Sequence, residues 1–280
     1  MPNKFVNDCC FRTMQQWIDE GLVADMLLVD LPYDGMTNNA WDSPMDLEKL
    51  WKLYDQLIKE NGAMIFTGRQ PFTSRLIMSK PEWFKFTMVW KKNLKSGNLN
   101  ARKRPMVSFE DVIVFYKKQP TYNPQRIPRT FQIKAGNKKN SKTTNYGKQS
   151  EYYRDRQSDW LMPDDVIDDE DNFFYVETLN EIKENPPMMT IEAVHNSSGK
   201  IHPTQKPVRL LEWLIMTFSN EGDTVLDNTA GSAATAIAAI KTNRNYWLCE
   251  KDKDIYTKAK ARIEKFREDK EDDKSIIDVL

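Results

Sequence analysis

The chain has 280 residues, 40% of them hydrophobic, which is enough for one large α/β domain or for a core of about 200 residues that carries an inserted module. Its 41 basic and 41 acidic residues cancel, so the net charge gives no indication of a nucleic-acid partner. Three cysteines without a Cys-x-x-Cys spacing argue against a disulfide scaffold and a zinc site, and no apolar run approaches the roughly 18 residues of a membrane span.

The N-terminal segment is polar where a secretory signal would be apolar. Asp8, Asp19 and Glu20 interrupt it. Together with the odd number of cysteines, this predicts a protein of a reducing, cytoplasmic compartment.

Strands and helices are predicted to alternate over the first part of the chain. Met26–Val29 is a short apolar run typical of a buried parallel strand. A helix is predicted over Pro44–Glu60, because Ser43 suits the N-cap, Pro44 suits the first turn and Gly62 suits the C-terminal stop. The next predicted elements are a strand, a helix and two strands, over Ala63–Thr67, Pro71–Met78, Phe84–Trp90 and Val112–Tyr116.

A local charge imbalance marks the middle of the chain. Residues 91–156 hold 17 lysines and arginines but 4 acidic residues, whereas residues 164–192 are acidic, with the run Asp168-Asp169-Glu170-Asp171. Residues 119–195 are rich in Asn, Gln, Ser, Thr and Tyr and have no sustained hydrophobic period. They are predicted to form an irregular insertion.

The alternation resumes after the insertion. Helices are predicted over Pro207–Phe218, Ala233–Ile240 and Asp254–Phe266, and strands over Thr224–Leu226 and Tyr246–Cys249. Strands and helices that alternate on both sides of an insertion predict an α/β fold with a doubly wound, mostly parallel sheet.

The first chemical motif is Asp30-Leu31-Pro32-Tyr33, at the end of the first apolar strand. Ligands of open α/β sheets bind beyond the carboxyl ends of strands. The amine of a nucleobase is a poor nucleophile, and a carboxylate and a carbonyl that accept its N–H groups would draw electron density to the nitrogen. Asp30 can supply the carboxylate, Leu31 the carbonyl, and Tyr33 a ring that stacks on an extruded base. An ordinary Asp-x-Pro turn at a strand end is the alternative.

The second motif, Asp227-Asn228-Thr229-Ala230-Gly231-Ser232, lies between a predicted strand and a predicted helix. Small residues that lead into a helix allow the backbone to approach a ligand and offer unpaired N–H groups. Glu250 ends the following strand, where an acidic side chain commonly binds ribose hydroxyls. These features predict a nucleoside-cofactor site, and the single glycine makes NAD a poor fit. A purely structural strand-to-helix turn is the alternative.

The third motif is His202-Pro203-Thr204-Gln205-Lys206-Pro207, which opens a predicted helix. No metal-ligand spacing surrounds His202 or the other histidine, His195, so a metal site is not expected. On composition alone the segment is a polar loop before a helix.

The three motifs in this order resemble those of the β-class DNA amino-methyltransferases. In these S-adenosylmethionine-dependent enzymes the order is circularly permuted, and the catalytic half precedes the cofactor loop. The resemblance covers residues 5–266 and is greatest to small adenine-directed members of bacteria and phages, which belong to restriction–modification systems. It implies a Rossmann-like methyltransferase sheet, double-stranded DNA as substrate, transfer to the N6 amine of a flipped adenine, and a possible homodimer.

The resemblance also implies roles for single residues. Asp30, Leu31, Pro32 and Tyr33 fall on the catalytic tetrapeptide of the family. Cofactor contacts are implied for Asp8, Cys9, Thr204, Lys206, Asp227, Thr229, Gly231, Ser232 and Glu250. The implied division is a catalytic half over residues 1–118, a target-recognition insertion over 119–195, a cofactor half over 196–268 and a charged tail over 269–280. The basic residues near the catalytic half are expected to contact DNA phosphates, namely Lys91, Lys92, Arg102, Lys103 and Arg104.

Three positions depart from the family pattern. Leu31 replaces the usual proline, which removes stiffness but keeps the carbonyl. Thr229 replaces a phenylalanine of the cofactor loop, and Ala233 replaces a second glycine, where its methyl group is expected to crowd the cofactor. The alternatives are therefore an N4-cytosine enzyme, a decayed relative that binds DNA or a partner without catalysis, and an enzyme that methylates RNA or a protein glutamine.

Overall fold

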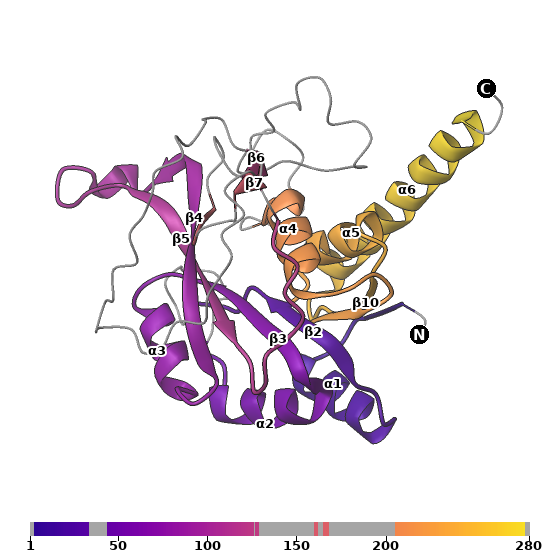
Figure 1. Ribbon diagram of the computed structural model, residues 1–280, viewed down its shortest axis with the longest axis horizontal. Helices are drawn as coiled ribbons and strands as arrows, with labels where there is room; N and C mark the ends of the chain where they lie inside the picture. The colour runs from indigo at the N-terminus through magenta and orange to yellow at the C-terminus, as the bar shows by residue number, and fades with distance from the viewer. Residues whose placement is uncertain are drawn as a thin grey trace, which may run out of the picture.

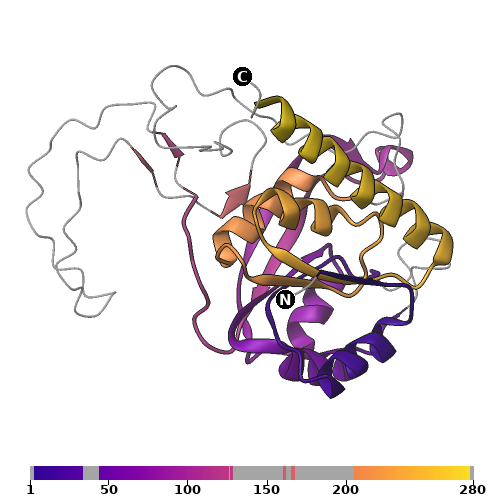
Figure 2. The same ribbon diagram turned by 90° about the vertical axis from the view of Figure 1, so that its right-hand side faces the viewer.

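The computed structural model describes residues 3–33, 44–125, 127–128, 160–161, 165–167 and 205–277 (Figures 1 and 2). Its centre is an eight-stranded sheet of order β1-β10-β9-β2-β3-β5-β4-β8. These strands are Lys4–Val6 (β1), Ala24–Val29 (β2), Ile58–Gly68 (β3), Phe84–Ser96 (β4), Val107–Phe115 (β5), Val166–Ile167 (β8), Thr224–Asp227 (β9) and Asn245–Cys249 (β10). A separate antiparallel pair joins β6 (Ile127–Pro128) to β7 (Trp160–Leu161).

The five strands from β1 to β3 in the sheet order are parallel to one another. β5 runs antiparallel to both β3 and β4, and β8 pairs parallel with β4. The prediction of a mostly parallel sheet is confirmed, with an antiparallel hairpin near one edge.

Helices cover both faces of the sheet (Figure 1). They are α1 (Cys10–Asp19), α2 (Leu47–Leu57) and α3 (Phe72–Ser79) on one face, and α4 (Val208–Phe218), α5 (Ala234–Lys241) and α6 (Lys253–Ile277) on the other. Leu27 and Met64 pack in the core under α1 to α3, whereas Leu28 and Ile65 pack in the core under α4 to α6. Because successive strand residues face opposite sides, both faces of a doubly wound sheet must be apolar, as these strands are.

α2 is shorter than the sequence predicted. Asp46 caps it, since its carboxylate accepts the backbone N–H of Lys49 at 3.0 Å, and the helix ends where β3 begins at Ile58. Ser43, the expected cap, lies outside the described residues. Gly62 is not a helix stop but a strand residue, where an added Cβ would lie 2.7 Å from the carbonyl oxygen of Asp25. The glycine allows β2 and β3 to approach closely.

Other differences lie at the ends of the chain. β1 and α1 were not predicted, and α6 continues to Ile277 instead of ending at Phe266. Ala259 and Ile263 attach the first half of α6 to the core, while its second half is mostly charged and has no apolar repeat to reveal a helix. Within the parts of the chain given above, no helix is long and apolar enough to cross a membrane.

Candidate active site

The candidate residues gather beyond the carboxyl ends of four neighbouring parallel strands. Asp8 follows β1, Glu250 follows β10, Asp227 ends β9, and Asp30 follows β2. Carboxyl ends of parallel strands share one edge of a sheet, so residues far apart in the sequence meet there. The structure therefore brings the first two sequence motifs and the N-terminal candidates to one edge.

The Asp30 carboxylate is held by three donors. Its Oδ1 accepts hydrogen bonds from the Tyr33 hydroxyl at 2.9 Å and from the Thr67 hydroxyl, and its Oδ2 accepts one from Lys206 Nζ at 2.6 Å. Thr67 lies at the end of β3 beside β2, and no sequence motif singles it out. A carboxylate with several donors is fixed in one orientation, which suits a group that must meet a substrate at a defined angle.

Lys206 connects Asp30 to a second carboxylate. Its Nζ lies 3.3 Å from Glu110 Oε2, and Lys92 binds the other oxygen of Glu110 at 2.9 Å. All three of these side chains are largely buried, at 10%, 15% and 11% exposure. Burial alone would lower the pKa of Lys206, but the Asp30 and Glu110 carboxylates raise it well above its usual value. Burial alone would raise the pKa of Glu110, but Lys206 and Lys92 hold it below its usual value.

This cluster changes the expectation for Lys92. A side chain that is largely buried and ion-paired with Glu110 does not present its ammonium to a DNA backbone. Alternation along β4 explains the difference, since Lys91 is exposed and its neighbour Lys92 points to the other face. Lys92 is therefore a partner of Glu110 and not a phosphate contact. Glu110 was missed because it carries no local motif.

Two further residues of the tetrapeptide, Leu31 and Tyr33, are fixed by packing. Leu31 is buried in the core under α1 to α3, so the residue that replaces proline anchors the turn by its side chain. The Tyr33 ring stacks on Phe72 of α3 with centroids 5.3 Å apart and an interplanar angle of 22°. Burial, with a smaller contribution from Asp30, raises the pKa of Tyr33 well above its usual value, so its hydroxyl stays protonated and donates to Asp30.

The loop after β9 is ordered by its own carboxylates. Asp227 Oδ1 accepts the N–H of Thr229 at 3.0 Å, and Asp227 Oδ2 accepts the Thr235 hydroxyl at 2.7 Å. Glu250 Oε2 accepts the N–H of Gly231 at 2.9 Å. The Thr229 hydroxyl donates to the backbone carbonyl of Asp30 at 3.1 Å, which joins this loop directly to the catalytic candidate. The residue that replaces phenylalanine thus makes a contact that a phenylalanine could not make.

Ala233 adopts the left-handed conformation that favours glycine, with φ 58° and ψ 34°. Alanine pays roughly 1 kcal/mol for this conformation. Its side chain is fully buried and belongs to the core under α4 to α6. The methyl group therefore packs inside the protein and does not project into open space beside the loop, contrary to the expected crowding.

Asp227 gives a prediction on stability. Burial, with smaller contributions from Asp30 and Glu250, raises the pKa of Asp227 from 3.8 to about 7, although its two hydrogen bonds oppose the shift. The folded protein thus favours the neutral acid, and this contribution to stability is full below about pH 4 and is lost as the pH rises to about 7. Asp227→Asn removes the titration. Urea titrations then give the free energy of unfolding of the variant minus that of the original protein. We expect this difference to rise by a few kcal/mol from about pH 4 to about pH 7. A difference that does not change with pH would contradict this assignment.

The N-terminal candidates lie beside Glu250. The side-chain amide of Asn7 donates to the backbone carbonyl of Glu250 at 2.8 Å, and the backbone N–H of Glu250 donates to Val6 at 3.0 Å. Asp8 pairs with Arg12 and accepts the N–H of Cys9 at 2.7 Å.

Ser232, in the loop after β9, is also fixed, because Arg262 of α6 donates to its carbonyl at 2.9 Å.

Other expected site residues are not at this edge or are not described. Thr204 falls outside the described residues, as does most of the insertion over 119–195. Arg102, Lys103 and Arg104 are exposed in the arm between β4 and β5, residues 97–106, which projects from the sheet and contains a short 3-10 helix, η1 (Asn98–Asn100) (Figure 1). The structure does not place these basic residues at the strand edge that carries Asp30.

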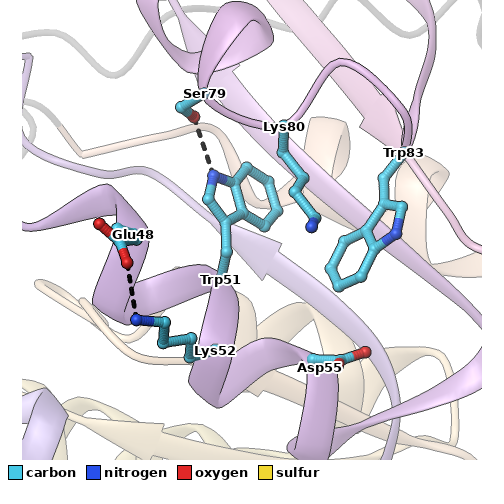
Figure 3. A pocket seen from close by; sticks show the side chains of 7 residues that line it. All are labelled: Glu48, Trp51, Lys52, Asp55, Ser79, Lys80 and Trp83. Carbon is cyan, nitrogen blue, oxygen red and sulfur yellow. Dashed lines mark hydrogen bonds and ion pairs between the residues drawn. The ribbon is translucent and has the colours of Figure 1, made fainter.

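A hollow of about 400 Å³ is lined by side chains of α2, by Ser79 at the end of α3, and by Lys80 and Trp83 (Figure 3). Its polar groups are satisfied by one another and by neighbours: the Trp51 indole donates to Ser79 at 2.8 Å, and Lys52 pairs with Glu48 at 2.6 Å. Lys80 lies over the Trp83 ring, 4.3 Å from its centroid. The hollow contains none of the candidate residues.

Comparison with known proteins gives one family. The family model described as DNA methylase, of the N6 and N4 type, matches residues 24–261. Type II methyltransferase M1.MboII of Moraxella bovis is 25% identical over 275 residues, which cover 92% of this chain and 95% of that protein. DNA adenine methyltransferase YhdJ of Escherichia coli K12 is 28% identical over 236 residues, 79% of this chain and 70% of that protein. Type II methyltransferase M2.DpnII of Streptococcus pneumoniae is 33% identical over 96 residues, and only 35% of that protein is spanned.

Solved structures agree on the fold. The complex of M1.HpyAVI with SAM superposes with a TM-score of 0.57 at 19% identity, over 92% of this chain and 98% of that one. The cytosine-N4-specific PvuII DNA methyltransferase also has a TM-score of 0.57, at 13% identity, over 96% of this chain and 91% of that one. The Rossmann-like methyltransferase sheet is thereby confirmed. Since the family match runs from β2 into α6 and covers most of the sequence, the chain belongs to the N6/N4 family of DNA methylases.

Proposed function

We propose that this DNA methyltransferase uses S-adenosylmethionine to methylate the N6 amine of an adenine extruded from double-stranded DNA. One observation carries the proposal. The Asp30 carboxylate follows β2, and the hydrogen bond from Thr229 to the Asp30 carbonyl ties it to the loop that follows the neighbouring strand β9. An acceptor for a base amine thus lies next to the loop expected to hold a nucleoside cofactor.

The chemistry is a direct displacement. The amine lone pair would form a bond to the methyl group that S-adenosylmethionine supplies, the bond from that carbon to sulfur would break with its electrons left on sulfur, and the nitrogen would release its extra proton to solvent. Asp30 accepts one N–H and the carbonyl of Leu31 accepts the other, which favours a tetrahedral nitrogen. Tyr33 contacts the face of the extruded base.

The residues of the loop fit a nucleoside cofactor. Glu250 uses one lone pair on each oxygen for the N–H groups of Gly231 and Asp252, both at 2.9 Å. A carboxylate has about four acceptor positions, so two remain for ribose hydroxyls. Gly231 lies in the left-handed region with φ 49°, where the backbone can turn close to a ligand. Asp8, Cys9, Asp227 and Ser232 complete the proposed cofactor contacts. The family resemblance implies Thr204, Lys206 and the permuted, β-class order, but the ammonium of Lys206 binds Asp30 and Glu110 in this structure.

The choice of adenine rests on Asp30. The two-acceptor geometry serves adenine N6 and cytosine N4 equally, and a fold like that of the cytosine-N4-specific PvuII enzyme is compatible with either. Aspartate at this position is usual in the adenine enzymes that the motif resembles. Methylation of cytosine C5 would need a cysteine nucleophile, but none of Cys9, Cys10 and Cys249 follows a proline, and burial raises the pKa of Cys10 to about 11 and raises that of Cys249 further.

Mass spectrometry of nucleosides tests this choice. DNA is treated with the protein and S-adenosylmethionine labelled in its methyl group. We expect label in N6-methyladenine, and more of it when the target adenine is unpaired within its site, because extrusion then costs less. Label in N4-methylcytosine alone would replace adenine by cytosine and keep the amino-methyltransferase. If the protein binds DNA but no label is transferred, the result would favour the decayed relative.

The exposed basic residues of the arm give a second prediction. Neutralising Arg102, Lys103 and Arg104 is expected to weaken DNA binding and to flatten its dependence on salt, by about 0.9 in the logarithmic slope for each phosphate that the variant no longer neutralises. Neutralising Lys258, Lys260 and Lys265, exposed on α6 at the opposite side of the molecule in Figure 1, removes the same charge and is expected to leave the slope nearly unchanged. Equal slopes in both triple variants would mean that the phosphates bind elsewhere.

A further inference from the structure

The ammonium of Lys206 lies where a target base would have to enter. Its Nζ is 2.6 Å from Asp30 Oδ2 and 5.7 Å from the centroid of the Tyr33 ring. Under the proposed function, Asp30 must accept an N–H of the base and Tyr33 must contact its face, so Lys206 occupies the first place and lies near the second. A cation beside the amine would also oppose the reaction, because the nitrogen gains positive charge as the methyl group arrives.

A second acceptor for Lys206 already lies within reach. Glu110 Oε2 is 3.3 Å from Lys206 Nζ, is buried and takes part in no hydrogen bond. Glu110 Oε1 is held at 2.9 Å by Lys92. Lys92 thus fixes the carboxylate, while its other oxygen, in an ion pair with Lys206, can still accept a well-aligned hydrogen bond from that ammonium.

The charges of the cluster favour a movement without proton transfer. Neighbouring carboxylates keep the pKa of Lys206 above its usual value, and neighbouring lysines keep the pKa of Glu110 below its usual value. Both groups are therefore ionised near neutral pH. A lysine has a flexible stem and rotatable donors, and a small rotation can carry its ammonium between two carboxylates. The charge stays paired throughout, so no bare ion is buried.

We infer that Glu110 is a positioning residue that takes the ammonium of Lys206 from Asp30 when a base amine docks, which frees Asp30 Oδ2 for the amine and clears the ring of Tyr33. The inference rests on the proposed function, since it requires a base at Asp30. Glu110 touches neither base nor cofactor in this account. It acts through Lys206.

The test uses Glu110→Gln in the full chain, which keeps the size of the side chain and removes the charge that receives Lys206. We expect kcat to fall about tenfold or more, the effect of removing one charge-assisted hydrogen bond, while the Kd for S-adenosylmethionine stays within about twofold. Binding is then compared on two duplexes that carry the methylated site, one with adenine and one with purine, which lacks the 6-amino group, at the target position. The preference for adenine should fall about tenfold in the variant. Adenine and purine pair with the opposite strand with different strength, but this difference is the same for the original protein and the variant. It therefore cancels when their adenine preferences are compared.

Two controls separate positioning from structure. Glu212→Gln removes another buried carboxylate paired with a lysine, Lys241 at 2.6 Å, which contacts neither Asp30 nor Lys206, and should leave kcat and the adenine preference unchanged. Lys206→Met removes the cation itself, and in that background Glu110→Gln should cause no further decrease in adenine preference. Glu110→Asp keeps the charge on a shorter side chain, should give an intermediate decrease, and replaces the glutamine variant if that variant does not fold.

The outcomes distinguish the two claims. If the original protein shows no preference for adenine over purine, the proposed function fails and the inference fails with it. If the original protein has the preference and Glu110→Gln keeps it, the inference is wrong while the proposed function stands. An equal decrease from Glu110→Gln with and without Lys206 would show a purely structural role and would also overturn the inference.

Discussion

Asp30→Ala is expected to abolish methylation and to leave the affinity for S-adenosylmethionine within a few-fold of the original. The reason lies in the contacts of Asp30: its carboxylate is bound by Tyr33, Thr67 and Lys206, and only its backbone carbonyl meets the cofactor loop through Thr229. The alanine variant keeps that carbonyl. It removes the acceptor for the base amine, whose contribution to the rate we place at a hundredfold or more, on the order of one preorganised electrostatic contact.

Asp25 offers a matched control on the same strand. It lies at the amino end of β2, pairs with Lys59 and accepts the N–H of Thr224 at 2.8 Å. Asp25→Ala therefore removes a similar ion-paired aspartate at the opposite edge of the sheet, and should change stability but not the turnover of the folded fraction. Rates from labelled-methyl transfer and cofactor affinity from calorimetry give both quantities. An active Asp30→Ala protein would refute the mechanism, and failure of a folded variant to bind cofactor would show that Asp30 serves the cofactor instead.

Glu250→Ala has the second largest expected effect, on cofactor affinity. A carboxylate that bridges two ribose hydroxyls makes charge-assisted hydrogen bonds worth roughly 1.5–3 kcal/mol each, so the Kd for S-adenosylmethionine should rise at least about tenfold. The variant also releases the N–H groups of Gly231 and Asp252, which loosens the loop. DNA affinity measured without cofactor should not change.

Glu250→Gln separates these two causes. Its amide oxygen can still accept a backbone N–H, but the amide lacks the charge and has only half of the acceptor positions of the carboxylate. We expect an intermediate Kd. If calorimetry gives the same Kd for the original protein and for Glu250→Ala, Glu250 only orders the loop and the ribose binds elsewhere.

The strand-end residues could be predicted because one rule connects sequence to space. Asp30, Asp227 and Glu250 each follow a short apolar run, and carboxyl ends of parallel strands converge. The same reasoning could not find Glu110, since β5 runs antiparallel and its contact with Lys206 depends on how the hairpin joins the sheet. Thr67 was missed for a similar reason: nothing in Ala63–Thr67 tells which polar residue of a strand will face the neighbouring site.

Local chemistry gave the wrong expectation at two positions. Gly62 follows a helical pattern and suits a helix stop, yet the close approach of Asp25 places it in β3. Lys92 belongs to a basic stretch, yet strand alternation turns it toward Glu110 while Lys91 stays exposed. In both cases pairing between strands decided the outcome, and a single sequence carries no direct record of strand pairing.

Mapping of modified bases in DNA from cells that express the protein tests the central claim most directly. Cells with the original sequence should carry N6-methyladenine at one recurring short sequence, and cells with the Asp30→Ala variant at the same protein level should carry none. Unmodified DNA in both, with folded protein present, would contradict the proposed function, and N6-methyladenine in both would contradict the role of Asp30.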